Sequence, residues 1–402
     1  MKIALVSSVY LPLKSSGAVQ MRDLAEELSR QGNLVYIFVP SPELEQDWKI
    51  ELINDVNVVR LKALPTTGLG YFRRTMGEFL MPYIMLWKLK KTGLHNESWD
   101  GVAWYSPTIF LGPLVKALKR ASGCRSYLII RDIFPEWAVD MGLMGRGIPY
   151  WFFDVVARYQ YSVADVIGVQ TSGNLAYFKD WARPPEQKVE VLQNWLADVP
   201  VSSCSISVAE TPLVERKIFV YAGNMGVAQG MDILLDLAER LNSRSDIGFL
   251  FVGRGSDAAR LSKDATSREL NNVWFHNEIH PDEIPGLYAQ CYVGLVALDP
   301  RHKTHNIPGK FLTYMQSGLP VLANINIGND LAELIRQEEV GRVSEDGTLD
   351  TLEQLALELI DTLQNDTKMS TRCRALYLRL FSPKTAVRQI IAGLHTEESI
   401  SP

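Results

Sequence analysis

A lysine at the start of a predicted helix is the residue of this chain best placed to do chemistry. The stretch from Arg301 to Pro320 reads RHKTHNIPGKFLTYMQSGLP, with a basic loop, a Pro-Gly turn, Lys310 and an abrupt Gly-Leu-Pro stop. The free N–H groups of a helix N-terminus and a nearby cation together suit a diphosphate. Taken alone, the same segment could also be an ordinary loop, helix and turn.

Two glycine-rich loops lie at the ends of predicted strands in the second half. The stretch 221–230 reads YAGNMGVAQG, with Asn224 and Gln229 among three glycines. The strand predicted at 247–253 runs into Gly-Arg-Gly, which places a cation, Arg254, at its carboxyl end. Flexible backbone can approach a ligand closely. A ligand-facing loop and a structural turn both remain open for 221–230.

A loop of small residues follows the first predicted strand. Residues 15–18 read SSGA and enter a helix, so that Gly17 lies where backbone could approach a phosphate or a sugar. The loop is not GxGxxG, and no acidic residue lies where a ribose partner would be expected. These two differences disfavour a dinucleotide site.

A carboxylate follows the fifth apolar strand of the first half. The strand at 127–131 ends in Arg131, and Asp132 comes next, before Phe-Pro-Glu. A carboxylate at a strand end could orient or deprotonate a hydroxyl group. The alternative is an Arg–Asp pair that only closes the strand.

Metal chemistry is disfavoured by the sequence. His302 and His305 are three residues apart, but no cysteine or carboxylate cluster accompanies them. Neither an Asp-x-Asp pair nor a Walker loop occurs in the chain, and its four cysteines form no CxxC pair. We therefore expect a metal-independent protein with reduced thiols, as in the cytosol.

The elements that must position these residues alternate between strands and helices. The chain has 402 residues, which favours two domains. Apolar strands alternating with helical patterns predict an α/β fold with two Rossmann-like, doubly wound domains facing a cleft. The expected parts are a first domain at 1–198, a linker at 199–216, a second domain at 217–383, and a C-terminal segment, 384–402, packing back on the first domain.

Composition excludes one class of partner and suggests another. With 47% hydrophobic and 22% charged residues and a net charge of −5, the chain has the composition of a globular protein without the basic surface that nucleic acid requires. The stretch 71–91 is different, because five cations flank a dense apolar and aromatic segment. Such a helix suits the surface of an anionic membrane, although a core helix with a solvated basic end is the alternative.

Taken together, these segments resemble the family 4 glycosyltransferases of the GT-B fold, which are retaining enzymes that use nucleotide-sugars. More closely, they resemble the N-acetyl-L-fucosamine transferases of bacterial O-antigen and capsule biosynthesis. The resemblance rests on YAGNMG at 221–226, AQG at 228–230, RDIFPE at 131–136 and PGKFLTYMQSGLPV at 308–321.

The resemblance implies roles for particular residues. The donor diphosphate would lie near Gly17, Lys310 and the helix start, and Asn224 and Gln229 stand where relatives often carry an arginine and a lysine. His305 and Thr313 stand where relatives commonly carry two glutamates, the first near the donor sugar and the second on the ribose. Asp132 and His305 would then be catalytic, and Arg254 would join the donor site.

The resemblance also implies a substrate pair and a location. The expected function is a hexosyltransferase that moves N-acetyl-L-fucosamine from a UDP-sugar to an undecaprenyl-diphosphate-linked saccharide. It would use no metal or other cofactor, bind no nucleic acid, and work in the cytoplasm at the inner face of the bacterial plasma membrane. The alternatives are an enzyme of the UDP-GlcNAc 2-epimerase type and a nonenzymatic scaffold of polysaccharide assembly.

Overall fold

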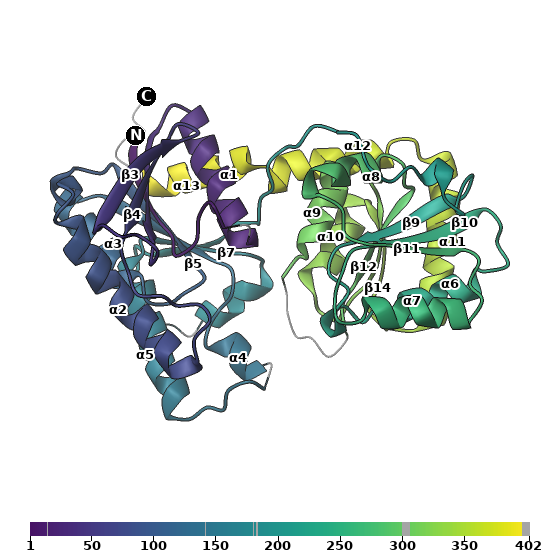
Figure 1. The fold of residues 1–402 in the computed structure, drawn as a ribbon, viewed down its shortest axis with the longest axis horizontal. Helices are drawn as coiled ribbons and strands as arrows, with labels where there is room; N and C mark the ends of the chain where they lie inside the picture. The colour runs from purple at the N-terminus through teal and green to yellow at the C-terminus, as the bar shows by residue number, and fades with distance from the viewer. Residues whose placement is uncertain (14, 141, 180, 182–183, 300–305, 396–402) are drawn as a thin grey trace. The chain divides into compact units, whose positions relative to one another are not determined.

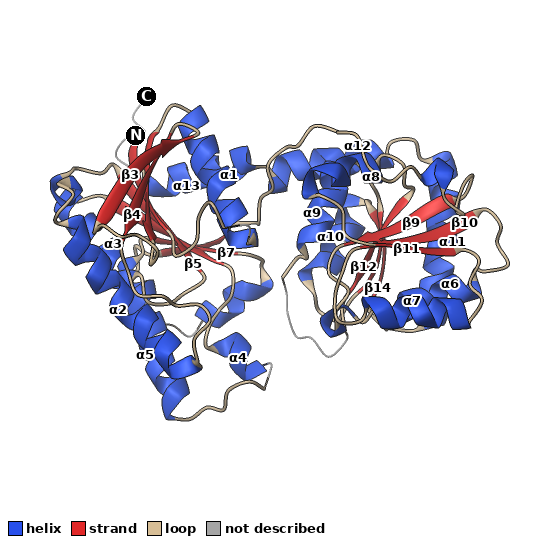
Figure 2. Cartoon of the chain, in the orientation of Figure 1, coloured by secondary structure: helices blue, strands red, loops and turns tan. Residues whose placement is uncertain are grey.

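The computed structural model describes residues 1–13, 15–140, 142–179, 181, 184–299 and 306–395. They divide into two compact units (Figure 1). Unit 1 is Met1–Trp195 together with the chain from Pro383 onward, and unit 2 is Leu196–Ser382. In each unit helices cover a largely parallel sheet (Figure 2). The expectation of two doubly wound α/β domains is therefore confirmed.

The sheet of unit 1 has eight strands in the order β3-β4-β2-β1-β5-β6-β7-β8. Its neighbouring strands are parallel except for β3 and β4. The central strands are continuous apolar runs because helices bury both of their faces. The strands are β1 (Lys2–Val6), β2 (Leu34–Pro40), β3 (Trp48–Ile53), β4 (Val56–Leu61), β5 (Gly101–Ser106), β6 (Arg125–Ile130), β7 (Val166–Val169) and β8 (Lys188–Val191).

Five long helices cover this sheet. One apolar core joins the sheet to α1 (Ser16–Arg30) and α13 (Pro383–Leu394), and a second core joins it to α2 (Tyr71–Leu89), α3 (Gly112–Ser122) and α5 (Ile148–Val163). The shorter helical segments of unit 1 are η1 (Leu94–Asn96), α4 (Glu136–Asp140) and η2 (Gly173–Phe178).

The helix α13 is an integral part of unit 1. Ala386, Val387 and Ile390 are buried in the same core as α1. A Cβ atom on Gly393 would lie only 2.8 Å from the ring of Tyr127, so the helix packs directly on the sheet. The chain therefore enters unit 2 after β8 and returns to complete unit 1.

The strand β3 is not expected from the sequence. It is an edge strand whose side chains are half-buried or exposed, so its apolar pattern is weak. A two-residue turn at Asn54 and Asp55, with φ of 49° and 61°, joins it to β4 as an antiparallel hairpin. Positive φ at both residues is typical of the turns that fit the twist of a hairpin.

Unit 2 has a six-stranded parallel sheet in the order β11-β10-β9-β12-β13-β14. The strands are β9 (Lys217–Ala222), β10 (Ile247–Val252), β11 (Val273–His276), β12 (Val293–Ala297), β13 (Val321–Asn324) and β14 (Gly341–Ser344). The helical segments are η3 (Val208–Glu210), η4 (Val227–Gln229), α6 (Asp232–Arg240), α7 (Ala258–Ser267), η5 (Pro281–Glu283), α8 (Ile284–Tyr288), α9 (Gly309–Gln316), α10 (Asp330–Glu338), α11 (Leu349–Asn365), α12 (Met369–Leu376) and the π-helical η6 (Tyr377–Phe381). Among the helices of eight or more residues in this unit, α7 is not expected from the sequence pattern.

The segment 199–216, expected as a linker, lies within unit 2. Ile206, Val208 and Leu213 are buried in the core of that unit. The Gln290 side chain accepts a hydrogen bond from the backbone of Val208 at 2.9 Å. The serine-rich composition hid these apolar residues because their spacing follows neither a helix nor a strand.

The loops that leave β9 and β10 touch through their backbones. A Cβ on Gly253, whose φ is +145°, would lie 2.0 Å from the carbonyl oxygen of Gly223. A Cβ on Gly255 would lie 2.2 Å from the carbonyl oxygen of Met225. The N–H of Met225 donates to the carbonyl of Arg254 at 2.8 Å. Gly253 and Gly255 therefore have a packing role where the two loops cross.

This crossing predicts a strong effect of Gly253→Ala. The substitution combines a disfavoured backbone conformation with a steric clash, and should lower the free energy of unfolding by about 3 kcal/mol. Gly347→Ala is the control, because Gly347 has a φ of +67° but no atom within 4 Å of its Cβ position. The control should cost about 1 kcal/mol. Urea denaturation measures both, and equal losses would contradict the role of the crossing.

Candidate functional site

The helix α9 begins at the carboxyl side of the sheet of unit 2. Pro308 is its N-cap residue, and Gly309 and Lys310 form the start of the first turn. The first N–H groups of a helix have no partner inside it and carry a partial positive charge. The helix ends at Gln316, and Gly318 has a φ of +68° just beyond it. The predicted helix with its glycine stop is present.

A tyrosine in the middle of α9 fixes this helix to the sheet. The hydroxyl of Tyr314 lies 3.1 Å from the carbonyl oxygens of both Val220 and Leu295, which belong to β9 and β12. The ring covers Gly294, where a Cβ would lie 2.6 Å from ring carbon. The bare glycine therefore determines how close α9 comes to the sheet.

Lys310 reaches from this helix onto the end of β9. Its Nζ lies 3.7 Å from the ring centroid of Tyr221 and donates a hydrogen bond to the hydroxyl of that tyrosine. Burial lowers the pKa of Lys310 to about 7. Among the described residues no carboxylate forms an ion pair with this amine. Binding of an anion next to Lys310 would therefore favour protonation of its amine.

The structure brings Asn224 and Gln229 next to this lysine. Tyr221 donates its hydroxyl hydrogen to the carbonyl oxygen of Asn224 at 2.7 Å. The side-chain amide of Asn224 donates to Gln229 Oε1 at 3.2 Å, and the N–H of Gly226 donates to the same oxygen at 3.0 Å. One hydrogen-bond chain thus runs from Lys310 through Tyr221 into the glycine-rich loop.

Two other residues expected at the donor site, Thr313 and Arg254, have other partners. The hydroxyl of Thr313 donates to the carbonyl oxygen of Lys310 at 2.8 Å, within the same helix. The guanidinium of Arg254 is mostly exposed and forms a 2.9 Å ion pair with Glu278. His305 lies outside the described residues, as do the basic residues 301 and 303.

In unit 1, Arg131 and Asp132 follow β6. Arg131 is buried, stacks on Trp195 at 4.6 Å and donates from Nη1 to the carbonyl oxygen of Leu192 at 3.0 Å. Its Nε and Nη2 have no hydrogen-bond partner among the described atoms. Burial raises the pKa of Asp132, whereas Arg131 lowers it. Asp132 reaches solvent, so this carboxylate is both accessible and more basic than usual.

Gly17 lies in the first turn of α1. A Cβ at this position would lie 3.0 Å from the ring of Tyr105, so the glycine makes room for a neighbouring aromatic side chain. Ser15 is the N-cap residue and accepts a hydrogen bond from Ala18 at 3.4 Å. Packing against Tyr105 favours a small residue here, and the expected role of Gly17 at the donor diphosphate stays a prediction.

Sequence reasoning missed the role of Tyr221. Its hydroxyl joins Lys310 to the glycine-rich loop, yet a tyrosine at the end of a buried strand does not predict such a bond.

In the part of the chain that the structure describes, no group of three His, Cys, Asp or Glu residues is arranged to hold a metal ion.

The helix α2 carries exposed aromatic side chains on one of its sides. Tyr71 and Phe72 are 92% and 77% exposed, and Trp87 is 56% exposed with the amines of Lys88 and Lys91 each 4.2 Å from its ring centroid. The other side of this helix belongs to the core of unit 1. In the described chain no helix is long and apolar enough to cross a bilayer.

Comparison with known proteins bears most directly on unit 2. Residues 216–365 match the family "Glycosyl transferases group 1". Two curated proteins are similar to the chain: the putative colanic acid biosynthesis glycosyl transferase WcaI of Escherichia coli K12, 27% identical, and the probable glycosyltransferase WbjE of Pseudomonas aeruginosa, 24% identical. The matches cover 58% and 56% of this chain, and 60% and 57% of the two relatives, so the chain spans less than two thirds of either relative's length.

Solved structures resemble the whole chain. Sucrose-phosphate synthase from Thermosynechococcus elongatus has a TM-score of 0.71 at 15% identity and matches over 98% of each chain. Anabaena HepE in complex with UDP has a TM-score of 0.68 at 17% identity, over 98% of this chain and 99% of that one. WaaG, a glycosyltransferase involved in lipopolysaccharide biosynthesis, has a TM-score of 0.60 at 14% identity, over 96% and 99%. The fold is that of the GT-B glycosyltransferases.

Proposed function

We propose that this protein is a glycosyltransferase that moves a sugar from a UDP-sugar to a lipid-linked saccharide. The observation that carries the proposal is the half-buried side chain of Lys310, whose amine lies at the start of α9 and on Tyr221. The match of residues 216–365 to a glycosyl transferase family supports it. The fold shared with HepE, which has been solved with UDP-glucose, supports a nucleotide-sugar donor.

In this proposal the donor diphosphate binds at the start of α9. The N–H groups of Gly309 and Lys310 and the lysine amine stabilise the negative charge that develops when the sugar leaves. Asn224 and Gln229 supply amide hydrogen-bond donors instead of the cations of relatives. The reaction then uses no metal and, as in family 4, retains the configuration of the donor sugar.

The acceptor chemistry is assigned to unit 1. The carboxylate of Asp132 accepts the proton of the acceptor hydroxyl, and its raised pKa makes it a better base. His305 acts beside the donor sugar. The donor is UDP-N-acetyl-L-fucosamine and the acceptor an undecaprenyl-diphosphate-linked saccharide, in O-antigen or capsule biosynthesis. The similarity to WcaI, a colanic acid biosynthesis glycosyl transferase, supports a role in bacterial polysaccharide assembly.

The enzyme would work in the cytoplasm on the inner face of the plasma membrane. The exposed aromatic side chains of α2 support this location, since tyrosine and tryptophan favour the interface of a bilayer. Arg73 and Lys90, the cations of 71–91 that form no ion pair among the described residues, support it as well, whereas Arg74, Lys88 and Lys91 are paired with carboxylates.

Lys310→Ala should weaken UDP binding about 30-fold, because a charged hydrogen bond to the diphosphate contributes about 2 kcal/mol. The melting temperature should not fall, because the substitution removes an amine that is costly to bury. Isothermal calorimetry measures the affinity. Lys263→Ala on α7, an exposed position, is the control and should bind as the unchanged protein. Equal affinity for both variants would refute the diphosphate site.

The lowered pKa of Lys310 predicts that UDP binding depends on pH. A diphosphate raises the pKa of this amine above its free value of about 7, so binding takes up a proton. The affinity is fully present below pH 7 and falls above it, by up to about tenfold per pH unit. Calorimetry in two buffers of different ionisation enthalpy measures the uptake. Lys310→Ala should abolish the uptake, and an unchanged pH slope in that variant would argue against this amine.

The donor is tested with a panel of UDP-sugars and a lipid-linked GlcNAc acceptor, with mass spectrometry of the product. We expect transfer from UDP-N-acetyl-L-fucosamine and little from UDP-GlcNAc or UDP-glucose. Transfer from a different UDP-sugar only would refute UDP-N-acetyl-L-fucosamine as the donor. Release of UDP from UDP-GlcNAc without any acceptor would indicate the epimerase alternative instead.

Membrane association predicts sedimentation with anionic liposomes that weakens as salt increases. Arg73→Glu, at an exposed position of α2, should reduce the bound fraction severalfold. Lys263→Glu makes the same charge change in unit 2 and should leave binding unchanged. Equal pelleting of the protein with and without liposomes would exclude a membrane surface.

A further inference from the structure

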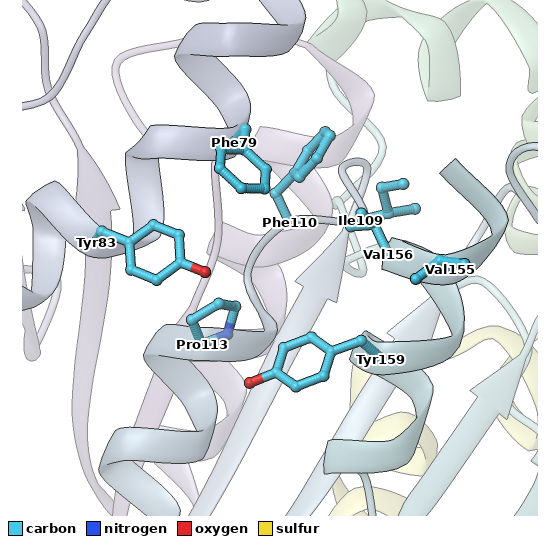
Figure 3. Close-up of a pocket in the computed structure, with 8 residues that line it drawn as sticks. All are labelled: Phe79, Tyr83, Ile109, Phe110, Pro113, Val155, Val156 and Tyr159. Atoms are coloured by element: carbon cyan, nitrogen blue, oxygen red, sulfur yellow. The ribbon is translucent and has the colours of Figure 1, made fainter. Parts of the chain in front are cut away.

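An apolar groove lies on unit 1 between α2 and α5 (Figure 3). Phe79 and Tyr83 line it from α2, Val155 and Tyr159 from α5, and Phe110 and Pro113 from the start of α3 and the loop before it. Its volume is about 270 Å³. The rings of Tyr83 and Tyr159 lie on either side of Pro113 in the close-up.

The lining selects the kind of ligand. Carbon atoms form nearly all of the groove surface, so hydrogen-bond donors and acceptors that could orient a sugar or a nucleotide are scarce. The volume is also below the range of about 300–1,000 Å³ that is typical of small-molecule sites. A narrow hydrocarbon chain fits both properties.

Exposed apolar side chains also lie on α5, the helix that forms one wall of the groove. On α5, Ile148 and Trp151 are 88% and 71% exposed. Phe152 of this helix lies 6.3 Å from Phe79 of α2, measured between ring centroids, so the outer faces of the two helices meet. Contiguous exposed apolar patches of this kind mark sites of interaction. Figure 1 shows both helices on the same side of unit 1.

The charges around the groove favour an anionic partner. Glu78 and Asp154, the carboxylates on α2 and α5, form ion pairs with arginines of their own helices. Arg73, Arg146 and Lys116 have no such pair among the described residues, and Lys116 lies 5.3 Å from the ring of Tyr159. Glu136, whose carboxylate accepts a hydrogen bond from Tyr150 of α5, also has no ion pair among the described residues. The three cations outnumber it and would attract a phosphate-bearing lipid.

Aromatic side chains connect the groove to the candidate acceptor site. Phe110 lies 6.5 Å from Phe153, and Phe153 lies 5.0 Å from Phe134, between ring centroids. Phe134 is two residues beyond Asp132. A chain seated in the groove therefore lies along an apolar wall that leads toward the loop carrying Asp132.

We propose that this groove binds the hydrocarbon chain of the lipid-linked acceptor, so that the chain is held by the protein as well as by the bilayer. The proposal rests on the proposed function for the identity of the acceptor. Binding of the chain would position the diphosphate and the first sugar, in addition to the attraction of α2 to a membrane surface.

Soluble prenyl diphosphates test the groove without a bilayer. Calorimetry compares inorganic diphosphate with dimethylallyl, geranyl and farnesyl diphosphate. Each buried methylene tightens binding severalfold, so farnesyl diphosphate should bind at least about tenfold tighter than geranyl diphosphate. Equal affinity at all chain lengths would overturn the proposal, because a diphosphate site alone would then explain binding.

A matched pair of variants tests the position. Val155→Trp places a large ring in the groove, and should weaken binding of farnesyl diphosphate at least about tenfold. Val214→Trp is the control, because Val214 is also 48% exposed but lies in unit 2. Thermal melting checks that both variants fold. If Val155→Trp leaves the affinity for farnesyl diphosphate unchanged, the prenyl chain binds elsewhere.

Further measurements distinguish the other occupants. Dihexanoyl phosphatidylglycerol that displaces farnesyl diphosphate equally well would indicate a general site for bilayer lipids and overturn the assignment to the acceptor. A dimer in light scattering that Val155→Trp dissociates would assign the groove to a second copy of the chain. UDP binding is measured in the same samples. Absence of UDP binding by the unchanged protein would contradict the proposed function. The dependence of affinity on prenyl chain length tests the groove separately.

Discussion

The distance between α9 and the sheet depends on one contact, in which the ring of Tyr314 lies against the backbone of Gly294. The hydroxyl of this tyrosine also lies 3.1 Å from carbonyl oxygens of two neighbouring strands, which adds polar contacts to the apolar packing of Phe311, Leu312 and Met315. Any side chain at residue 294 would push the helix outward and carry Lys310 away from Tyr221. Residues with no chemical role of their own therefore set the geometry of the polar site.

Each unit holds a cation whose pKa is lowered by its surroundings, and the two cations differ in kind. Lys310 has a pKa of about 7 and can lose its proton when no anion is present, which reduces the cost of its burial. Arg131 has a pKa lowered only to about 10, so it stays charged at neutral pH and is held by Trp195 and a backbone carbonyl. The lysine can therefore respond to a ligand by changing its charge, whereas the arginine supplies a constant positive field.

Sequence patterns predicted the elements that depend on the order of neighbouring residues. Continuous apolar runs located the buried parallel strands, and the Pro-Gly and Gly-Leu-Pro signals located the ends of α9. They failed where contacts between residues distant in sequence determine the structure. β3 is an edge strand with a weak pattern, and α7 was overlooked. The segment 199–216 is buried by unit 2 despite its polar composition. The bond between Lys310 and Tyr221 joins residues 89 positions apart, which a motif cannot show.

The return of the chain to unit 1 has a consequence for its synthesis. A protein emerging from the ribosome folds from its N-terminus, domain by domain. Here the face of the first sheet that contacts α1 lacks its other covering helix, α13, until residue 394 has been made. Unit 2 is complete before that point. The unit whose residues are translated first is therefore the last to be finished, and its apolar surface around Tyr127 and Val166 stays open to chaperones or to aggregation during elongation.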